Sequence, residues 1–177
     1  MPYKALEVAN YFLDLAKRDK KPISPMKLQK LVYFAHGWNL ALRNEPLLLE
    51  RVEAWDYGPV IPAVYHAFKE CGRGEIKELA ASVDLDDDGK IVIADYVLKA
   101  DKDTFALLKR VWDVYRSYTA IQLSNATHDP DGAWFKTYHE GEGAQRRGVD
   151  IPDPLIREEF IGRIKRSKEP REPREHA

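Results

Sequence analysis

Two histidines are the residues whose chemistry could be catalytic. His36 lies within a long apolar stretch, and His128 precedes Asp129 in a run of turn-forming residues. A His–Asp pair beside a nucleophile such as Ser124 or Cys71 would form the constellation of a hydrolase. The chain has no Gly-x-Ser-x-Gly elbow, and Cys71 falls at a predicted helix end beside glycines. We therefore expect no enzyme, with His36 a hydrogen-bonded core or rim residue and His128 a turn residue that caps backbone groups.

A run of aspartates offers a second kind of chemistry. The segment 84–95 matches positions 1, 3, 5, 6, 8 and 12 of an EF-hand calcium loop, although position 12 holds Asp95 instead of the usual Glu. The turn-forming residues 86–90, between two apolar runs, instead predict a β-hairpin. We expect the hairpin and leave calcium open. The five histidines show no pair at metal-ligand spacing, so we expect no other metal and no cofactor.

The composition predicts a protein with a substantial hydrophobic core and no strong electrostatic field from its net charge. The chain has 177 residues, of which 44% are hydrophobic and 11% aromatic, with a formal charge of −1. This length predicts one domain, and the near-neutral charge predicts no nucleic-acid partner. A single cysteine, Cys71, excludes an internal disulfide framework and fits a cytoplasmic protein. No stretch approaches the roughly 18 apolar residues of a membrane span, so we expect no membrane partner.

One helix must position most of the candidate residues. Ser24 can cap it and Pro25 suits its first position, and apolar residues then continue almost all the way round as far as Leu42. Such a pattern predicts a central buried helix. Its polar residues need either solvent or partners: Lys27, Gln29, Lys30, His36 and Asn39.

Shorter elements surround this helix. The first helix of the chain has an apolar face and exposes Asn10 on the other. Further helices are predicted over 62–71, 101–118, 119–126 and 153–166, with extended structure over 47–57 and a mobile glycine-rich loop over 138–149. We expect a mainly α (α+β) fold, a compact helical domain around a buried central helix with a small β-sheet or hairpin. This domain covers 1–166, and a disordered charged tail covers 167–177.

Several motifs resemble those of one family. The run Ser24-Pro25-Met26-Lys27-Leu28-Gln29-Lys30-Leu31-Val32-Tyr33-Phe34-Ala35 resembles the opening of the Panacea domain, which is found in SocA-like antitoxins and GepA-type phage-associated proteins. The stretch 53–65, the run Leu123-Ser124-x-x-Thr127-His128 with the following Trp134, and the stretch 151–160 agree in the same order. The similarity covers about residues 5 to 165.

The resemblance implies an antitoxin that neutralises a cognate toxin protein by direct contact and needs no active site. SocA-like members can also present their toxin to an ATP-dependent protease. The alternative is a phage-type DNA-binding transcriptional regulator that uses residues 25–42 as a recognition helix. The oligomeric state stays open, a homo-oligomer included.

The family motifs also mark candidate site residues. Their polar groups either tie the central helix to the strand at 53–57 and the turn at 127–128, which we favour, or face the toxin. The motif residues are Ser24, Pro25, Lys27, Gln29, Lys30, Tyr33, His36, Trp55, Tyr57, Gly58, Pro59, Ser124, Thr127, His128 and Trp134.

Overall fold

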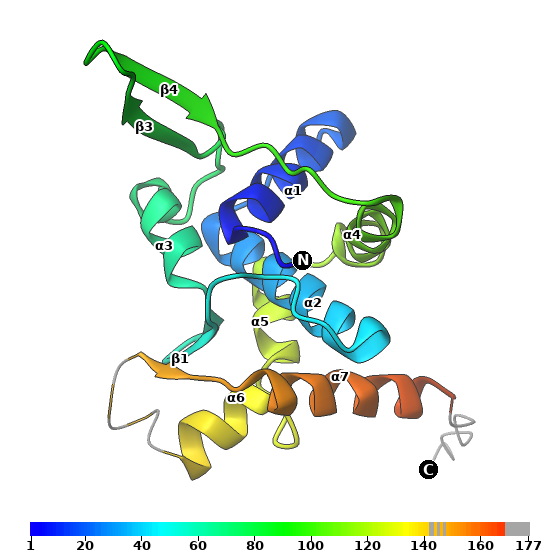
Figure 1. Ribbon diagram of the computed structural model, residues 1–177. Coiled ribbons are helices and arrows are strands. Elements are labelled where there is room, and N and C mark those ends of the chain that lie inside the picture. The colour runs from blue at the N-terminus through cyan, green and yellow to red at the C-terminus, as the bar shows by residue number, and fades with distance from the viewer. Residues whose placement is uncertain (142–143, 145, 147, 169–177) are drawn as a thin grey trace, which may run out of the picture.

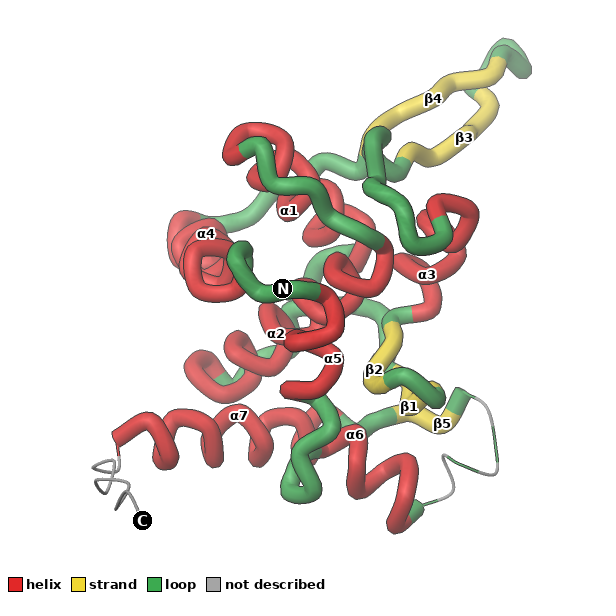
Figure 2. The backbone as a smooth tube through the Cα atoms, turned by 180° about the vertical axis from the view of Figure 1, so that it is seen from behind, coloured by secondary structure: helices red, strands yellow, loops and turns green. Residues whose placement is uncertain are grey.

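The computed structural model describes residues 1–141, 144, 146 and 148–168. Helices make up most of these residues, together with one small antiparallel sheet and one separate hairpin (Figures 1 and 2). The predicted mainly α (α+β) fold is therefore confirmed. No helix among the described residues is long and apolar enough to cross a membrane.

Helix α2 (Pro25–Arg43) is the centre of the fold. The Ser24 hydroxyl accepts a hydrogen bond from the backbone N–H of Lys27, and Pro25 occupies the first helical turn, where its missing N–H has no partner to lose. The helices that pack most extensively on α2 are α1 (Ala5–Asp19), α4 (Lys102–Tyr115), α5 (Ala120–Ala126) and α7 (Asp153–Lys168) (Figure 1). This arrangement explains the nearly all-round apolar pattern of α2.

Local signals set the ends of the other helices. Helix α4 begins where an Asp101 carboxylate oxygen accepts a hydrogen bond from Thr104 N, and α5 begins with a capping box between Thr119 and Gln122. Helix α3 (Pro62–Phe68) starts with a proline and continues as the 3-10 helix η1 (Lys69–Cys71). The observed helix is shorter than the one predicted over 101–118, since α4 ends at Tyr115.

A three-stranded sheet lies beside α2, with strand order β2-β1-β5 (Figure 2). Its strands are β1 (Glu53–Trp55), β2 (Gly58–Val60) and β5 (Val149–Asp150), all antiparallel to their neighbours. The expected extended structure over 47–57 is only partly correct: Leu48 makes one isolated bridge to Tyr3, and the strand begins at Glu53.

Strands β3 (Ala81–Leu85) and β4 (Ile91–Asp95) form the expected hairpin. The carboxylate of Asp86 shapes its turn, since Oδ1 accepts hydrogen bonds from the backbone N–H groups of Asp88 (3.0 Å) and Lys90 (2.8 Å). Nowhere in the described part of the chain do three His, Cys, Asp or Glu side chains gather so that they could hold a metal ion.

The chain between α5 and α7 differs from the sequence prediction. Helix α6 (Ala133–Phe135) continues as a π-helical turn, η2 (Lys136–Glu140), so the predicted loop at 138–149 is wrong for residues 138–140, and it is also wrong for Val149, which lies in β5. The ring of Trp134 stacks on that of Tyr138, with centroids 5.0 Å apart, and this contact favours continued helix. Residues 142–143, 145 and 147 of this loop, and residues 169–177 of the expected tail, lie outside the described residues.

Candidate functional site

A buried lysine of α2 binds the turn between β1 and β2. The Lys30 side chain is 2% exposed, and its Nζ donates hydrogen bonds to the carbonyl oxygens of Tyr57 (3.0 Å) and Pro59 (3.1 Å). Burial lowers the pKa of the Lys30 ammonium to about 7. Two carbonyl dipoles thus replace the water that would otherwise solvate this group.

Gly58 lies between the two residues whose carbonyls Lys30 binds. Its φ of +107° is a conformation that residues with a Cβ rarely adopt. A Cβ at this position would lie 2.5 Å from Lys30 Nζ and 2.9 Å from Thr127 Oγ1. Backbone conformation therefore favours glycine here, and a Cβ would also have to displace the Lys30 or Thr127 side chain.

The end of α5 contacts the same turn. The Ser124 hydroxyl donates a hydrogen bond to the Tyr57 carbonyl (3.2 Å), which also accepts from Lys30. The Thr127 hydroxyl donates to the Ser124 carbonyl (2.7 Å) and so satisfies the last turn of its own helix. Motif residues from three distant segments thus meet at one carbonyl.

His128 and Trp134 extend this cluster towards β1. Their rings pack with centroids 4.2 Å apart, and Trp134 Nε1 donates a hydrogen bond to the Trp55 carbonyl (2.8 Å). Burial, with the nearby Lys30 charge, lowers the pKa of His128. The buried Nε2 of His128 has no hydrogen-bond partner among the described residues, so the expected capping of backbone groups is wrong for this atom. The ring packs on an aromatic side chain instead.

The first turns of α2 supply further motif contacts. The amide of Gln29 binds both backbone groups of Ile61, with Nε2 donating to its carbonyl (3.1 Å) and Oε1 accepting from its N–H (3.0 Å). The Nζ of Lys27 donates to the Arg116 carbonyl (2.6 Å), and burial lowers the pKa of Lys27. These side chains fix α2 to the start of α3 and the end of α4.

His36 is buried deeper in α2. Its Nδ1 accepts a hydrogen bond from the backbone N–H of Leu47 (3.3 Å), and its Nε2 lies 3.1 Å from Asp153 Oδ1. Because a backbone N–H can only donate, we assign the proton of the neutral ring to Nε2, which then donates to Asp153. His36 is the hydrogen-bonded core residue that the sequence predicted.

A groove opens beside the β1–β2 turn. Its volume is ≈ 590 Å³, and its lining includes Trp55, Tyr57, Tyr65, Lys69 and Arg73. The rings of Trp55 and Tyr65 pack edge to face with centroids 4.8 Å apart, while Tyr57 is 76% exposed. The motif residues therefore divide into a buried polar cluster and an aromatic rim that solvent reaches.

Comparison with known proteins finds relatives of this chain. The model of the family described as "Antitoxin SocA-like, Panacea domain" matches residues 28–135. The chain is 34% identical, over 157 residues, to "Antitoxin SocA" of Caulobacter vibrioides (strain NA1000 / CB15N), which is 88% of this chain and 81% of that protein. This chain belongs to the SocA-like Panacea-domain family. No solved structure matches it with significance.

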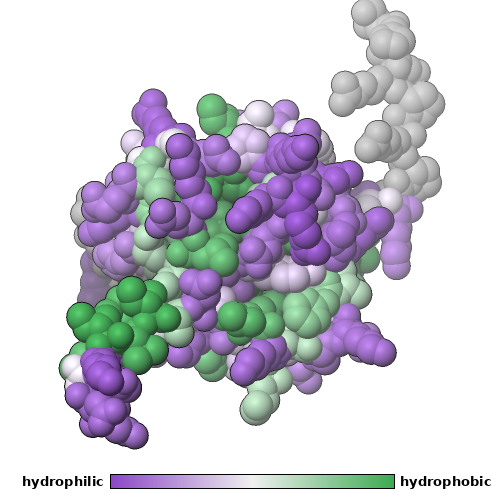
Figure 3. All heavy atoms as spheres, turned by 90° about the horizontal axis from the view of Figure 1, so that it is seen from above, coloured by the Kyte–Doolittle hydropathy of each residue, from purple (hydrophilic) through white to green (hydrophobic). Residues whose placement is uncertain are grey.

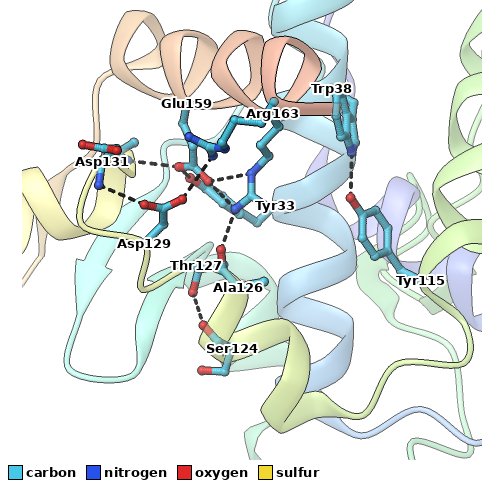
Figure 4. Close-up of polar contacts among 12 residues, drawn as sticks. Tyr33, Trp38, Tyr115, Ser124, Ala126, Thr127, Asp129, Asp131, Glu159 and Arg163 are labelled. Carbon is cyan, nitrogen blue, oxygen red and sulfur yellow. Dashed lines mark hydrogen bonds and ion pairs between the residues drawn. The ribbon is translucent and has the colours of Figure 1, made fainter. Parts of the chain in front are cut away.

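Sequence reasoning missed one buried network of this Panacea-domain protein, which Figure 4 shows. The Tyr33 hydroxyl donates to Glu159 Oε2 (2.8 Å), which also accepts from Ala133 N (3.0 Å), and Arg163 binds the other oxygen of the same carboxylate. Arg163 also donates to the Ala126 carbonyl. The signal in the sequence was a Glu–Arg pair at i,i+4 beside the inward Phe160.

A second missed residue of the Panacea fold is Asn10, which was expected on the exposed face of α1. It is buried, and its amide binds the N–H and carbonyl of Ala80 (2.9 and 2.8 Å) and the carbonyl of Tyr96 (3.0 Å). The available signal was a polar residue between Ala9 and Tyr11, in the apolar stretch of the first helix.

The candidate hydrolase residues do not form a reacting set in this Panacea domain. Ser124 donates to Tyr57, His36 pairs with Asp153, and Cys71 is exposed in η1. No hydrogen bond between described residues joins Ser124 or Cys71 to a histidine, and a nucleophile needs a base within that reach.

Proposed function

We propose that this protein is the antitoxin of a toxin–antitoxin pair and neutralises its cognate toxin by direct protein contact, without catalysis. The observation that carries the proposal is the 34% identity to Antitoxin SocA across 88% of the chain. The motif geometry supports a binding module, because Lys30, Gln29 and Ser124 use their polar atoms to join segments of the chain.

Co-expression with the products of the genes on either side tests this function. One of these products should arrest growth when expressed alone, and the antitoxin should restore growth and co-purify with it. Failure of every adjacent product to bind and to be neutralised would overturn the proposal. The half-life of the toxin in the same strains reports on presentation to an ATP-dependent protease: the toxin disappears faster with the antitoxin present if that route operates, and persists as a complex if binding alone suffices.

The stoichiometry of protection tests the absence of catalysis. A binding antitoxin protects in proportion to its amount, so about one molecule is required for each molecule of toxin. A folded His128→Ala variant should protect as well as the wild type. Protection at a small fraction of the toxin concentration, lost in this variant, would indicate an enzyme instead.

A DNA-binding regulator is the competing function. It would require α2 as a recognition helix, but the side chains of α2 from Lys27 to Gly37 are all buried by neighbouring elements. Salt-dependent binding of the purified protein to its own promoter would revive this alternative.

A further inference from the structure

The β3–β4 hairpin stands apart from the helices (Figure 1). Its two strands pair only with one another among the described strands, and they are exposed over almost their whole length. An isolated two-stranded hairpin is marginally stable in water, because it buries little apolar surface. Beyond their mutual pairing, the strands of this arm join no other strand among the described residues.

One face of the hairpin is entirely aliphatic near its end. The register places Val83 opposite Ile93 and Leu85 opposite Ile91, so these four side chains share a face. They are 68%, 69%, 69% and 70% exposed, respectively. The view from above in Figure 3 shows the resulting apolar patch, bordered by a hydrophilic tip.

The opposite face has the composition expected of a solvent-facing surface. It carries Ser82, Asp84, Val92 and Ala94 in cross-strand pairs, with a single large apolar residue. The hairpin thus alternates as a strand pair does when one face is covered. Its apolar face is nevertheless exposed to solvent, as the polar face is, and exposed apolar patches of this kind mark interaction sites.

The base of the hairpin is held firmly. The buried amide of Asn10 in α1 binds Ala80 on one side of the hairpin and Tyr96 on the other. These residues immediately precede β3 and follow β4. The body of the protein therefore fixes where the arm leaves the surface, which lowers the entropy lost when the arm binds a partner.

The net charge of the hairpin favours some binding partners over others. Residues 81–95 contain five aspartates and one lysine, a net charge of −4. Two copies of the arm packed face to face would bring two such charges together, and like charges at an interface disfavour association. A partner with basic residues around an apolar strip would satisfy both the aliphatic face and the aspartates.

We infer that the β3–β4 hairpin is the arm with which this protein binds its toxin, by packing Val83, Leu85, Ile91 and Ile93 on an apolar strip of the toxin flanked by basic residues. The inference rests on the proposed antitoxin function. The partner of the hairpin is then the toxin, and the toxin surface that the hairpin contacts is basic.

A matched pair of substitutions tests the apolar contact. Val83→Thr and Val92→Thr make the same nearly isosteric change on opposite faces of the hairpin, and Thr retains strand propensity. The probe is the purified toxin identified among the adjacent gene products. Val83→Thr combined with Ile93→Thr should weaken binding by about tenfold or more, because both side chains lose apolar burial, and Val92→Thr should leave affinity within about twofold. Equal affinity of the wild type, the Val83→Thr/Ile93→Thr variant and the Val92→Thr variant for the toxin would overturn the inference.

A second pair of variants tests the charge of the partner. Asp87→Asn with Asp88→Asn removes two charges at the tip and leaves the turn-forming Asp86 carboxylate in place. The association rate with the same toxin should fall severalfold at low salt and lose much of its salt dependence. A faster association, or a rate that salt never affected, would exclude a basic partner surface.

These results separate the inference from the proposed function. Growth rescue that persists in the Val83→Thr/Ile93→Thr variant would leave the antitoxin function standing and remove the arm from it. Absence of rescue by the wild type would overturn both. Sedimentation of the wild-type protein alone tests whether the hairpin binds a second copy of this chain. A dimer that the Val83→Thr/Ile93→Thr substitution dissociates would assign the hairpin to self-association and overturn the inference.

Discussion

Gly37 of α2 lies directly against the ring of Phe160 of α7. A Cβ at Gly37 would be 2.1 Å from Phe160 Cε2, closer than any side chain tolerates. The same ring packs edge to face with Tyr33, Phe34 and Trp38, at centroid distances of 5.8, 5.6 and 5.1 Å. The glycine therefore sets how closely α7 approaches the central helix, and three aromatic rings fix the position of Phe160.

Substitution of Gly37 by alanine should destabilise the protein, although alanine favours helix. Phe160 would have to move within a close-packed core, and such overpacking costs typically about 1–3 kcal/mol, more than the roughly 1 kcal/mol gained in helix propensity. Chemical denaturation of the purified variant measures the change. Gly162→Ala in α7 is the control, since the nearest atom to its new Cβ is a flexible arginine nitrogen 3.7 Å away. Greater stability of both variants would show that the contact is not tight.

Alanine at Gly58 should cost more stability than alanine at Gly89. Both glycines have positive φ, +107° and +76°, but only Gly58 faces atoms within 4 Å. Gly89→Ala reports the backbone strain alone, about 1–2 kcal/mol, and the excess at Gly58 reports the displacement of Lys30 and Thr127. Urea unfolding of the two variants gives this difference. Equal losses would indicate that Lys30 moves aside without cost.

The Tyr33 hydroxyl should contribute measurably to stability through Glu159. Tyr33→Phe removes a buried hydrogen bond to a carboxylate, a change expected to cost about 1.5–3 kcal/mol. Tyr138→Phe removes the corresponding bond to Asp56 at an exposed site, where water replaces the lost partner and we expect a much smaller loss. Thermal unfolding of both variants at one pH provides the comparison, and similar losses would argue against a special role of burial.

Lys30 should make stability rise with pH above neutrality. Its pKa is about 7 in the folded chain and 10.5 in a solvated lysine, so the unfolded state binds more protons between these values. The free energy of unfolding then increases with pH by at most about 1.4 kcal/mol per unit. Lys27, whose pKa burial also lowers, contributes in the same direction, whereas the raised pKa of Tyr33 lowers stability only above about pH 10.

A Lys30→Met variant isolates this contribution. It loses two hydrogen bonds and is expected to be less stable, but the informative quantity is the slope of unfolding free energy between about pH 7.5 and 9.5. The slope should be flatter than that of the wild type. An unchanged slope would mean that the folded and unfolded states bind the Lys30 proton equally well.

Sequence patterns predicted the helices and turns of this fold better than the long-range contacts between them. The cap at Ser24, the proline at the first turn of α2 and the turn chemistry of residues 86–90 are local, because each acts through bonds to nearby backbone groups. Strand β5 was not predicted, since two residues hydrogen-bonded to β1 carry no periodic signal of their own. Asn10 was misplaced for a related reason: its two backbone partners lie 70 and 86 residues away.

By itself the sequence determined the helical class, the burial of the central helix over most of its length and the family, because these depend on apolar periodicity, capping residues and motifs read along the chain. Only the tertiary structure decided that Lys30, Ser124 and Gly58 meet at one turn, and that Tyr33 shares a buried carboxylate with α7. It also decided that an aliphatic face of the hairpin lies open. These facts depend on which surfaces meet in three dimensions, and close packing settles that for the whole chain at once.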